Sequence, residues 1–352
     1  MIQKRQLFAL ILVLALLSGC GQPAPQAPES REITDMAGRT VAVPEEIVSA
    51  FPTDPTAGIF LYTLVPDRML GWNYALNDLE KSVIPEEYHH LPNFGMGDAI
   101  NYEAVLAAGP SIILIVAAIS DGTVDTADKL SAQLGIPAVV VSNALEDTPE
   151  AYRFMGRVFG VEDQAEKLAA YAEKTFADVA AAAIPEAEKL RVYYGNGEDS
   201  LETALAGSVS GQILEMAGAV NAASAELEGG NRVDISLEHL LAWDPDVIVV
   251  NGEPKADLSG YAAAADILSN SDFAALSAVR NGRVYGIPNA PFSWLDRPPG
   301  PNRIVGVRWL FGLLYPERCG YDVDEEIRTY FEVFYHVTLT DEQLERLCAG
   351  TL

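Results

Sequence analysis

The fold is decided by a unit that occurs twice: "INYEAVLAAGPSIILIV", residues 100–116, and "ISLEHLLAWDPDVIVVN", residues 235–251. In both copies Ile and a small polar residue precede a Glu, and an apolar turn containing Leu-Ala leads to a Pro and a hydrophobic run. Because Asn101 and Ser236 are favourable N-caps, each copy predicts a short helix followed by a buried strand. A unit built twice indicates two similar halves.

Valine- and isoleucine-rich runs alternate with helical segments around both copies. Examples are "SIILIVAAISDG" (111–122), "IPAVVVSN" (136–143) and "LRVYYGNG" (190–197). Uninterrupted apolar runs bounded by helices are typical of strands that are buried on both faces, hence of a parallel sheet. The sequence therefore predicts an α/β fold of two lobes, with parallel-rich sheets flanked by helices.

A long helical segment separates the two halves. Residues 149–183 show no strand pattern, and their second part combines apolar residues at helical spacing with many alanines. One helix of about 20 residues would be about 30 Å long, enough to bridge two lobes. The predicted organisation is a lipoprotein signal peptide (1–19), a lipid-anchored flexible tether (20–31), an N-terminal α/β lobe (32–155), a bridging helix (156–184) and a C-terminal α/β lobe (185–352).

Composition excludes some classes of function. The chain has 352 residues, of which 49% are hydrophobic and 21% charged, as expected of a packed globular protein. Its net charge of −27 argues against a nucleic-acid partner, whose phosphates would be repelled. Two interpretations of this acidity remain: it keeps an exposed protein soluble, or it favours cationic ligands or partners.

The N-terminus predicts export. A basic start, "MIQKR", precedes an apolar run, "LFALILVLALL", that is too short to span a bilayer, and this pattern is typical of a secretory signal. Leu17-Ser18-Gly19-Cys20 resembles a bacterial lipobox, which implies cleavage before Cys20 and acylation of its thiol. An unprocessed membrane anchor is the alternative. We therefore expect an exported protein, lipid-anchored at the outer face of the cell membrane or in the periplasm.

Two cysteines remain after Cys20: Cys319 and Cys348. In an exported protein, two thiols favour a disulfide, and a pair of buried free cysteines is the alternative. The sequence contains no Cys-x-x-Cys spacing, so we do not expect a zinc site.

No catalytic motif is recognisable. "GSVSG" (207–211) does not place Ser at the centre of a nucleophile elbow, and "GNGEDS" (195–200) lacks the third Gly of a dinucleotide fingerprint. We therefore expect a binding protein with no catalytic residues. An extracytoplasmic α/β enzyme and a cell-surface interaction module without a ligand are the alternatives from other classes.

The repeated Glu, Glu103 in one copy and Glu238 in the other, has two interpretations. Each falls in the first turn of its predicted helix, where the macrodipole favours an anion, so both could serve helix stability alone. Alternatively, a matched pair of acidic side chains, one in each lobe, would suit docking against a symmetric partner with two basic sockets.

Both copies of the unit resemble a segment of the iron-complex and vitamin B12 substrate-binding proteins of ABC importers. In that family the segment reads roughly Asn/Ser-x-Glu, a helical turn, Lys-Pro-Asp and a buried strand. "NYEAVLAAGPSIILI" (101–115) and "SLEHLLAWDPDVIVV" (236–250) are similar, although the first has Gly-Pro-Ser where Lys-Pro-Asp is usual. The resemblance spans about residues 32–345.

The resemblance implies a fold and a set of partners. It implies two α/β lobes bridged by a long helix, a protein without a cofactor of its own, and delivery of cargo to a permease dimer that has a cytoplasmic ATPase. It also implies that Glu103 and Glu238 dock onto arginines of the permease. The cargo would be an iron chelate of siderophore or haem type, with a corrinoid such as cobalamin as the alternative.

The ligand should lie between the lobes, in loops at the carboxyl ends of strands. Aromatic side chains recur there and would suit a flat macrocycle or chelate, although each of them could instead pack inside a lobe. "SWLDRPPG" (293–300) and "YYGNGEDSLETALAGS" (193–208) resemble loops of the branch labelled iron- or haem-type. The predicted ligand-binding residues are Trp72, Tyr74, Met96, Tyr194, Trp294 and Arg297.

Two details of this site stay open at the level of sequence. Arg297 offers a planar fork for a carboxylate or a chelating oxygen, but it could instead pair internally with Asp296 or another acid. Haem iron would need an axial Tyr, His or Met. The side chains chemically able to ligate it are Tyr74, His89, His90, Met96 and Tyr194.

Overall fold

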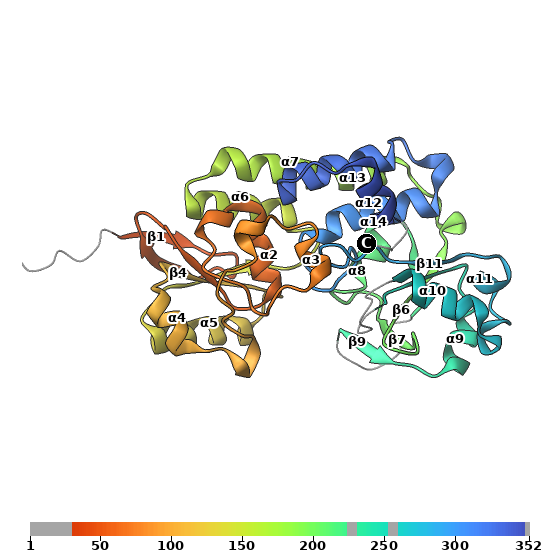
Figure 1. Cartoon of the computed structure of the whole chain (residues 1–352), viewed down its shortest axis with the longest axis horizontal. Helices are drawn as coiled ribbons and strands as arrows, with labels where there is room; N and C mark the ends of the chain where they lie inside the picture. The colour runs from red at the N-terminus through yellow and green to blue at the C-terminus, as the bar shows by residue number, and fades with distance from the viewer. Residues whose placement is uncertain (1–29, 224–230, 253–259, 349–352) are drawn as a thin grey trace, which may run out of the picture.

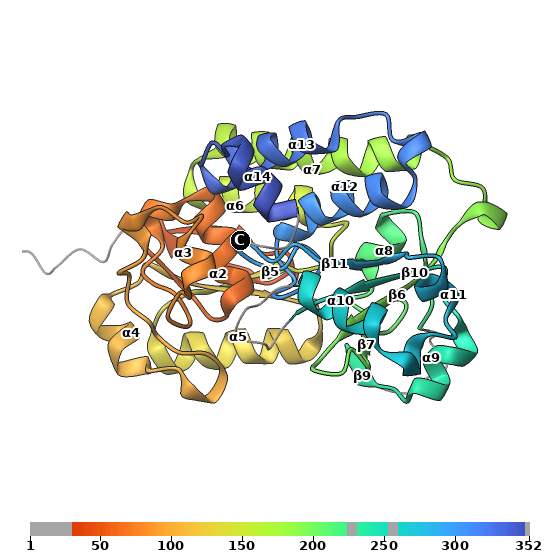
Figure 2. The ribbon, with the colours of Figure 1, turned by 45° about the vertical axis from the view of Figure 1, so that its right-hand side comes forward.

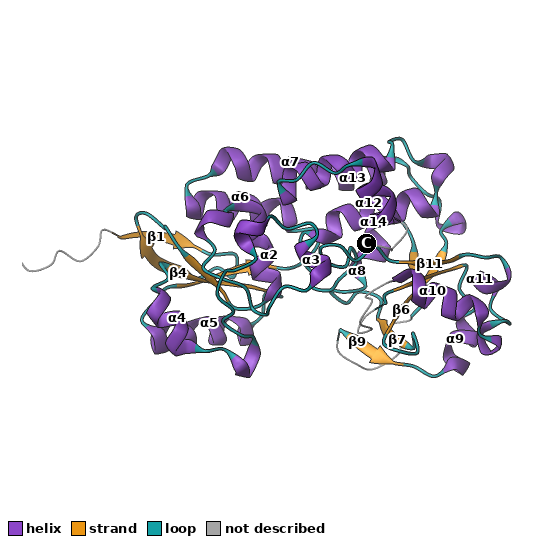
Figure 3. Cartoon of the chain, in the orientation of Figure 1, coloured by secondary structure: helices purple, strands orange, loops and turns teal. Residues whose placement is uncertain are grey.

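The computed structural model describes residues 30–223, 231–252 and 260–348. Two lobes, each built on its own sheet, lie side by side beneath a layer of helices (Figure 1, Figure 3). The predicted signal peptide, Cys20 and most of the predicted tether lie outside the described residues. The last two residues of the predicted tether, Ser30 and Arg31, belong instead to the first strand.

The N-terminal lobe is built on a parallel sheet of three strands in the order β3-β4-β5. The runs of Ile and Val predicted as buried strands form its two longer strands, in which every residue but Ala117 is buried. The elements of this lobe are β1 (Ser30–Thr34), β2 (Thr40–Pro44), β3 (Ala50–Pro52), α2 (Pro55–Leu64), α3 (Asp78–Lys81), α4 (Tyr102–Ala108), β4 (Ile112–Ala117), α5 (Asp121–Leu134) and β5 (Ala138–Ser142).

The first two strands form an antiparallel hairpin that the sequence patterns did not predict. Its turn is organised by Asp35, whose carboxylate accepts hydrogen bonds from the amides of Ala37 and Arg39, at 3.1 and 2.9 Å. The same carboxylate accepts a bond from the amide of Val140 in β5, at 3.1 Å. One buried acid therefore shapes the hairpin and fastens it to the sheet.

The C-terminal lobe contains a mixed sheet in the order β11-β10-β6-β7-β9, with β8 paired to β6. The central strands β6, β10 and β11 are parallel, as predicted. Strands β7 and β9 were not predicted, and β7 pairs antiparallel with both β6 and β9. The elements of this lobe are β6 (Arg191–Asn196), β7 (Glu202–Ala204), α8 (Gln212–Met216), β8 (Val220–Asn221), β9 (Arg232–Asp234), α9 (Leu237–Trp243), β10 (Val247–Val250), α10 (Gly260–Ser269), α11 (Ser277–Arg280) and β11 (Val284–Gly286).

The repeated unit forms the same structure in both lobes, as predicted. Asn101 caps α4 by accepting from the amide of Ala104, and Ser236 caps α9 by accepting from the amide of His239. Each helix ends in a left-handed residue and leads into a central buried strand, β4 or β10. Figure 1 and Figure 2 agree that α4 and α9 lie on the side of the molecule opposite the helical layer.

The helical layer lies across both lobes, and its longest member is α7 (Figure 2). The helix begins at Glu162 rather than near residue 156, because Gly160 adopts the left-handed conformation and ends α6. Gly156 lets the two helices approach, since a Cβ there would lie 2.5 Å from that of Ala165. The elements of the layer are α6 (Thr148–Phe159), α7 (Glu162–Ala181), α12 (Asn302–Leu314), α13 (Val323–Tyr330), a π-helix (Phe331–Tyr335) and α14 (Asp341–Cys348).

One apolar core continues from lobe to lobe through this layer. The same cluster of buried side chains includes Leu114 of β4, Leu168 of α7, Val249 of β10 and Leu310 of α12. Burial of apolar surface stabilises by about 25 cal/mol per Å², so sliding one lobe against the other would expose costly surface. We infer that the lobes move little relative to each other.

Arg308 of α12 joins three helices of the layer. Its guanidinium is fully buried, contacts Asp178 of α7 at 2.5 Å and Glu326 of α13 at 3.5 Å, and lies 4.4 Å from the centre of the Tyr321 ring. Burial alone would raise the pKa of Asp178, but hydrogen bonds from Lys174 and Arg308 hold it below its ordinary value.

We predict that Arg308→Met lowers the free energy of unfolding by about 3 kcal/mol, because it removes the buried cation that contacts both Asp178 and Glu326. Lys174 still contacts both acids, which keeps the loss at the lower end for a broken buried pair. The control is Arg153→Met, whose exposed partners Glu166 and Glu173 predict a loss below about 1 kcal/mol. Urea unfolding measures both; equal losses would contradict the role of Arg308.

Asp54 links β3 to α2 at the carboxyl end of the N-terminal sheet. Its carboxylate caps α2 by accepting from the amides of Thr56 and Ala57, at 2.8 and 3.1 Å. Burial nevertheless raises the pKa of Asp54 above its ordinary value of 3.8, against those hydrogen bonds. The folded state thus favours the protonated carboxyl more than the unfolded chain does.

We predict that Asp54→Asn changes how stability depends on pH. The stability contributed by a raised pKa is fully present below the unfolded value and is lost as pH rises through the folded value. Lowering the pH from about 8 to about 4 should therefore stabilise the wild type relative to Asp54→Asn, which keeps a capping side chain. Thermal unfolding of both proteins across this range measures the difference; parallel curves would contradict the raised pKa.

Candidate functional site

The loops at the carboxyl ends of strands in the two lobes meet. From the segment after β11, Phe292 lies 6.4 Å from Trp72 of the N-terminal lobe, measured between ring centroids. Gln212 of α8 accepts a hydrogen bond from the amide of Leu145, which follows β5, at 3.1 Å. Carboxyl ends of parallel strands are where α/β sheets bind ligands, so this junction is the candidate site.

Arg303 places a buried positive charge at the junction. Its guanidinium donates to the carbonyls of Asn143 in the N-terminal lobe, at 2.5 Å, and of Val209 in the C-terminal lobe, at 3.0 Å. Its remaining hydrogen bond within the described chain goes to a third carbonyl, that of Gly300. Burial lowers the pKa of Arg303 to about 10, against the favourable charges of Asp296 and Glu146. Arg303 therefore stays cationic at neutral pH and forms no ion pair with any residue that the structure describes.

A second charged group lies in the C-terminal lobe. Asp296 is buried, pairs with Arg232 at 2.6 Å and accepts a hydrogen bond from the hydroxyl of Tyr194. Glu202 of β7 contacts Arg297 at 2.8 Å and Arg232 at 3.3 Å. Burial, followed by the charge of Asp296, raises the pKa of Tyr194 well above its ordinary value, so Tyr194 is a neutral donor.

Several buried polar atoms at the junction have no hydrogen-bond partner among the described residues. Buried polar groups are nearly always paired, and each unpaired group costs about 1–3 kcal/mol, so a cluster of them indicates a place that a ligand or ordered water completes. The unpaired atoms at or beside strand carboxyl ends are Asn73 Oδ1, Asn143 Oδ1, Asn196 Nδ2, both polar atoms of Asn251, Ser293 Oγ and Asn302 Oδ1.

The structure places the predicted ligand-binding residues unevenly. Arg297 lies beside the junction, and its side chain donates to Asn196 at 3.2 Å as well as pairing with Glu202. Its acidic partner there is Glu202 rather than its neighbour Asp296. Tyr74 donates to Glu80 at 2.6 Å, and Met96 is 46% exposed.

The predicted aromatic residues Trp72, Tyr194 and Trp294 are at most 3% exposed. Trp294 contacts the rings of Trp309 and Phe331 within the core, and Trp72 lies between other rings. Their burial occurs because the junction is packed as a continuation of the core. These rings therefore present no open face on which a flat macrocycle could stack.

Two of the side chains that are chemically able to ligate haem iron are adjacent histidines. His89 contacts the carbonyl of Ile84 through Nε2 at 2.5 Å, and His90 is exposed. Across the described ranges, no group of three or more His, Cys, Asp and Glu side chains could hold a metal ion.

Sequence patterns missed Arg303, Arg232, Glu202 and Asn251. A signal existed for the first and the last of these. Asn302 and Arg303 begin the helix "NRIVGVRWLFGLL", whose other residues are apolar apart from Arg308, and Asn251 directly follows the apolar strand "VIVV". A polar residue at the end of a buried run is a candidate for function rather than for packing. Arg232 and Glu202 belong to short strands that carry no comparable pattern.

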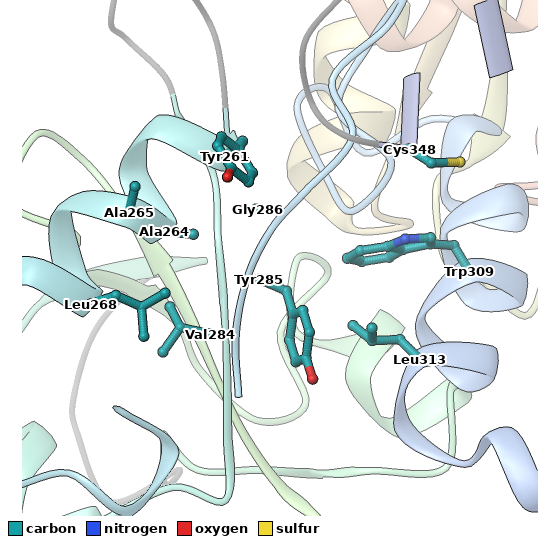
Figure 4. A pocket seen from close by; sticks show the side chains of 10 residues that line it. All are labelled: Tyr261, Ala264, Ala265, Leu268, Val284, Tyr285, Gly286, Trp309, Leu313 and Cys348. Carbon is teal, nitrogen blue, oxygen red and sulfur yellow. The ribbon is translucent and has the colours of Figure 1, made fainter. Parts of the chain in front are cut away.

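A separate apolar pocket of about 300 Å³ lies between β11, α10 and α12 (Figure 4). Trp309 and Leu313 of α12 form one wall, and Val284 and Leu268 lie opposite. It is lined mainly by apolar side chains and has few polar groups to orient a ligand, so we do not assign the cargo to it.

The predicted disulfide between Cys319 and Cys348 is wrong in this structure, where both cysteines are free. Cys348 lines the apolar pocket beside Trp309 and Leu313, whereas Cys319 packs against the position of Gly312 and donates to the carbonyl of Tyr321. Burial, followed by the charge of Asp324, raises the pKa of Cys348 to about 11.

Comparison with known proteins agrees with this architecture. A family model described as "Periplasmic binding protein" matches residues 68–291. The molybdate-binding protein MolA of Haemophilus influenzae is 26% identical, over 96% of this chain and 99% of the relative. An uncharacterised ABC transporter substrate-binding lipoprotein of Bacillus subtilis, YvrC, is 25% identical, over 88% of this chain and 96% of the relative.

Among solved structures, an ABC transporter solute-binding protein from Sulfurospirillum deleyianum superposes with a TM-score of 0.80 at 27% identity, covering 91% of this chain and 99% of that chain. The vitamin B12-binding protein BtuF of Vibrio cholerae shares the fold, with a TM-score of 0.58 at 20% identity, covering 77% of this chain and 97% of that chain.

No helix in the described part of the chain is long and apolar enough to cross a membrane. Members of the matched family bind solutes outside the cytoplasm, carry no cofactor of their own and work with a permease and an ATPase rather than as enzymes. The chain belongs to the periplasmic binding protein family and is the substrate-binding component of an ABC importer.

Proposed function

We propose that the protein captures a compact anionic metal complex between its lobes. The observation that carries this proposal is Arg303, a buried cation at the junction whose hydrogen bonds, among the described residues, go to carbonyls of the two lobes and the adjoining loop. In a low-dielectric setting a cation that no carboxylate contacts directly attracts an anion strongly, even in a chain of net charge −27. An iron chelate of siderophore type is the first candidate.

A second candidate is a metal oxyanion. The relative from Haemophilus influenzae is named a molybdate-binding protein, and the junction offers carboxamides and a hydroxyl with vacant hydrogen bonds. Small oxyanions are recognised by such groups without aromatic stacking. Haem and cobalamin are less well supported, because the rings expected to stack on them are enclosed by protein.

We predict saturable one-to-one binding of anionic complexes and none of cobalamin. The panel is ferric citrate, a ferric catecholate siderophore, haem, cobalamin, molybdate and nickel–histidine. Binding is followed by calorimetry and by tryptophan fluorescence, to which Trp72 at the junction contributes. Arg303→Met should lower affinity by about 10- to 100-fold, and Arg303→Lys by less, because Lys keeps the charge. Binding of cobalamin alone, or equal affinity in Arg303→Met, would overturn the proposal.

We also propose that Glu103 and Glu238 dock the protein onto its permease from a lipid anchor at Cys20, which lies outside the described residues. Both glutamates are exposed, and they occupy equivalent positions of α4 and α9 on one side of the molecule. Hydrogen bonds from the Ser236 hydroxyl and its own backbone amide lower the pKa of Glu238, which keeps this carboxylate ionised.

We predict that Glu103→Arg with Glu238→Arg abolishes uptake of the cargo while its affinity stays unchanged. The expected reason is repulsion between the new arginines and basic sockets on the permease. Uptake by cells and calorimetry on the purified protein give the two readouts.

The matched control is Asp163→Arg with Glu325→Arg, which makes the same charge change in the first turns of α7 and α13, within the opposite layer. Uptake should survive this control. Normal uptake by the docking double variant would exclude the docking role.

A further inference from the structure

Asn196 and Asn251 lie side by side at the carboxyl edge of the C-terminal sheet. β6 and β10 are parallel neighbours in which Tyr194 is opposite Val249, and both of these side chains belong to one core cluster. The register continues, because the amide of Asn251 donates to the carbonyl of Gly195 at 2.9 Å. Two residues further along each strand, the two carboxamides therefore occupy the same face, on strands about 4.8 Å apart.

The two carboxamides have vacant hydrogen-bonding atoms although both residues are 0% exposed. Asn196 accepts from Nε of Arg297 through Oδ1, at 3.2 Å, and its Nδ2 has no partner. Within the described part of the chain, neither Oδ1 nor Nδ2 of Asn251 has a partner. A buried carboxamide without hydrogen-bond partners destabilises the fold, because its desolvation is not offset. An apolar residue of the same shape would avoid this desolvation free energy.

We propose that the Asn196–Asn251 pair is a recognition site for an oxygen-rich anion that also carries an O–H group, as a hydroxyl or a metal-bound water. This inference rests on the proposed function and names a subsite for its cargo. The two Nδ2 groups donate to ligand oxygens, and Oδ1 of Asn251 accepts from the O–H group. Arg297, held on Asn196 and Glu202, adds positive charge at the same edge.

A hydroxycarboxylate chelate such as ferric citrate offers both kinds of group, whereas tetrahedral molybdate offers oxygens for the Nδ2 donors but no O–H group; the experiment separates them. Asn251→Leu replaces the carboxamide by an apolar group of similar shape. We expect a loss of affinity of at least tenfold for whichever of the two anions the wild type binds. We expect the thermal midpoint of the empty protein to stay the same or to rise.

Asn221 provides the matched control, since it is a buried Asn on the neighbouring strand β8 whose carboxamide is paired at both ends. It donates to the carbonyl of Ala204 and accepts from the amide of Ala223, each at 2.9 Å. Asn221→Leu should lower the thermal midpoint and leave affinity within twofold of the wild type. The two substitutions are therefore expected to act in opposite ways on stability and binding.

Wild-type affinity retained in Asn251→Leu would overturn the subsite and leave the proposed function standing. If the wild type binds neither anion, the proposed cargo class fails. The thermal unfolding midpoint then tests the subsite, because a lowered midpoint in Asn251→Leu would show that Asn251 has a structural role instead. Should Asn251→Leu not fold, Asn251→Asp keeps the shape, adds a negative charge and removes the donor. Unchanged affinity in that variant would equally overturn the proposal.

Discussion

The structure depends on the contacts that helix α12 makes with both lobes. At its first turn Arg303 donates to the carbonyl of Asn143, which follows the last strand of the N-terminal sheet. Five residues later Arg308 is buried against Asp178 of α7. Apolar side chains between and around these arginines continue one core through the molecule. The geometry of the candidate site is therefore set by a helix of the layer that covers both sheets.

The surface and the junction differ in electrostatic character. The chain as a whole is strongly acidic, and screening by salt confines that surface field to about 8–10 Å. Inside the junction, Arg303 is shielded from water by burial, so its charge acts on a ligand more strongly than a surface charge would. An acidic protein can thus hold an anion, provided that the contact is made in the interior.

Much of the fold could be predicted from the sequence, because its signals are local. The duplicated unit, its N-caps at Asn101 and Ser236 and the parallel central strands were all recognisable, and so was membership of an importer's binding-protein family. The hairpin of β1 and β2 was missed, since Asp35 fastens it to the distant Val140 through a tertiary contact.

The ligand site was harder to predict than the fold. Aromatic residues in loops suggested stacking, but a Trp near a strand end packs into a core as readily as it meets a ligand, and Trp294 does the former. Whether a buried Asn finds hydrogen-bond partners depends on neighbours from other strands, which no local pattern records. The continuous core also limits how an importer can sense its cargo. Because the lobes share one apolar core, the distance between α4 and α9 should stay nearly constant. A permease that contacts both helices would therefore meet the same spacing in the loaded and the empty protein. A signal that cargo is bound would have to come from the loops at the carboxyl ends of the strands.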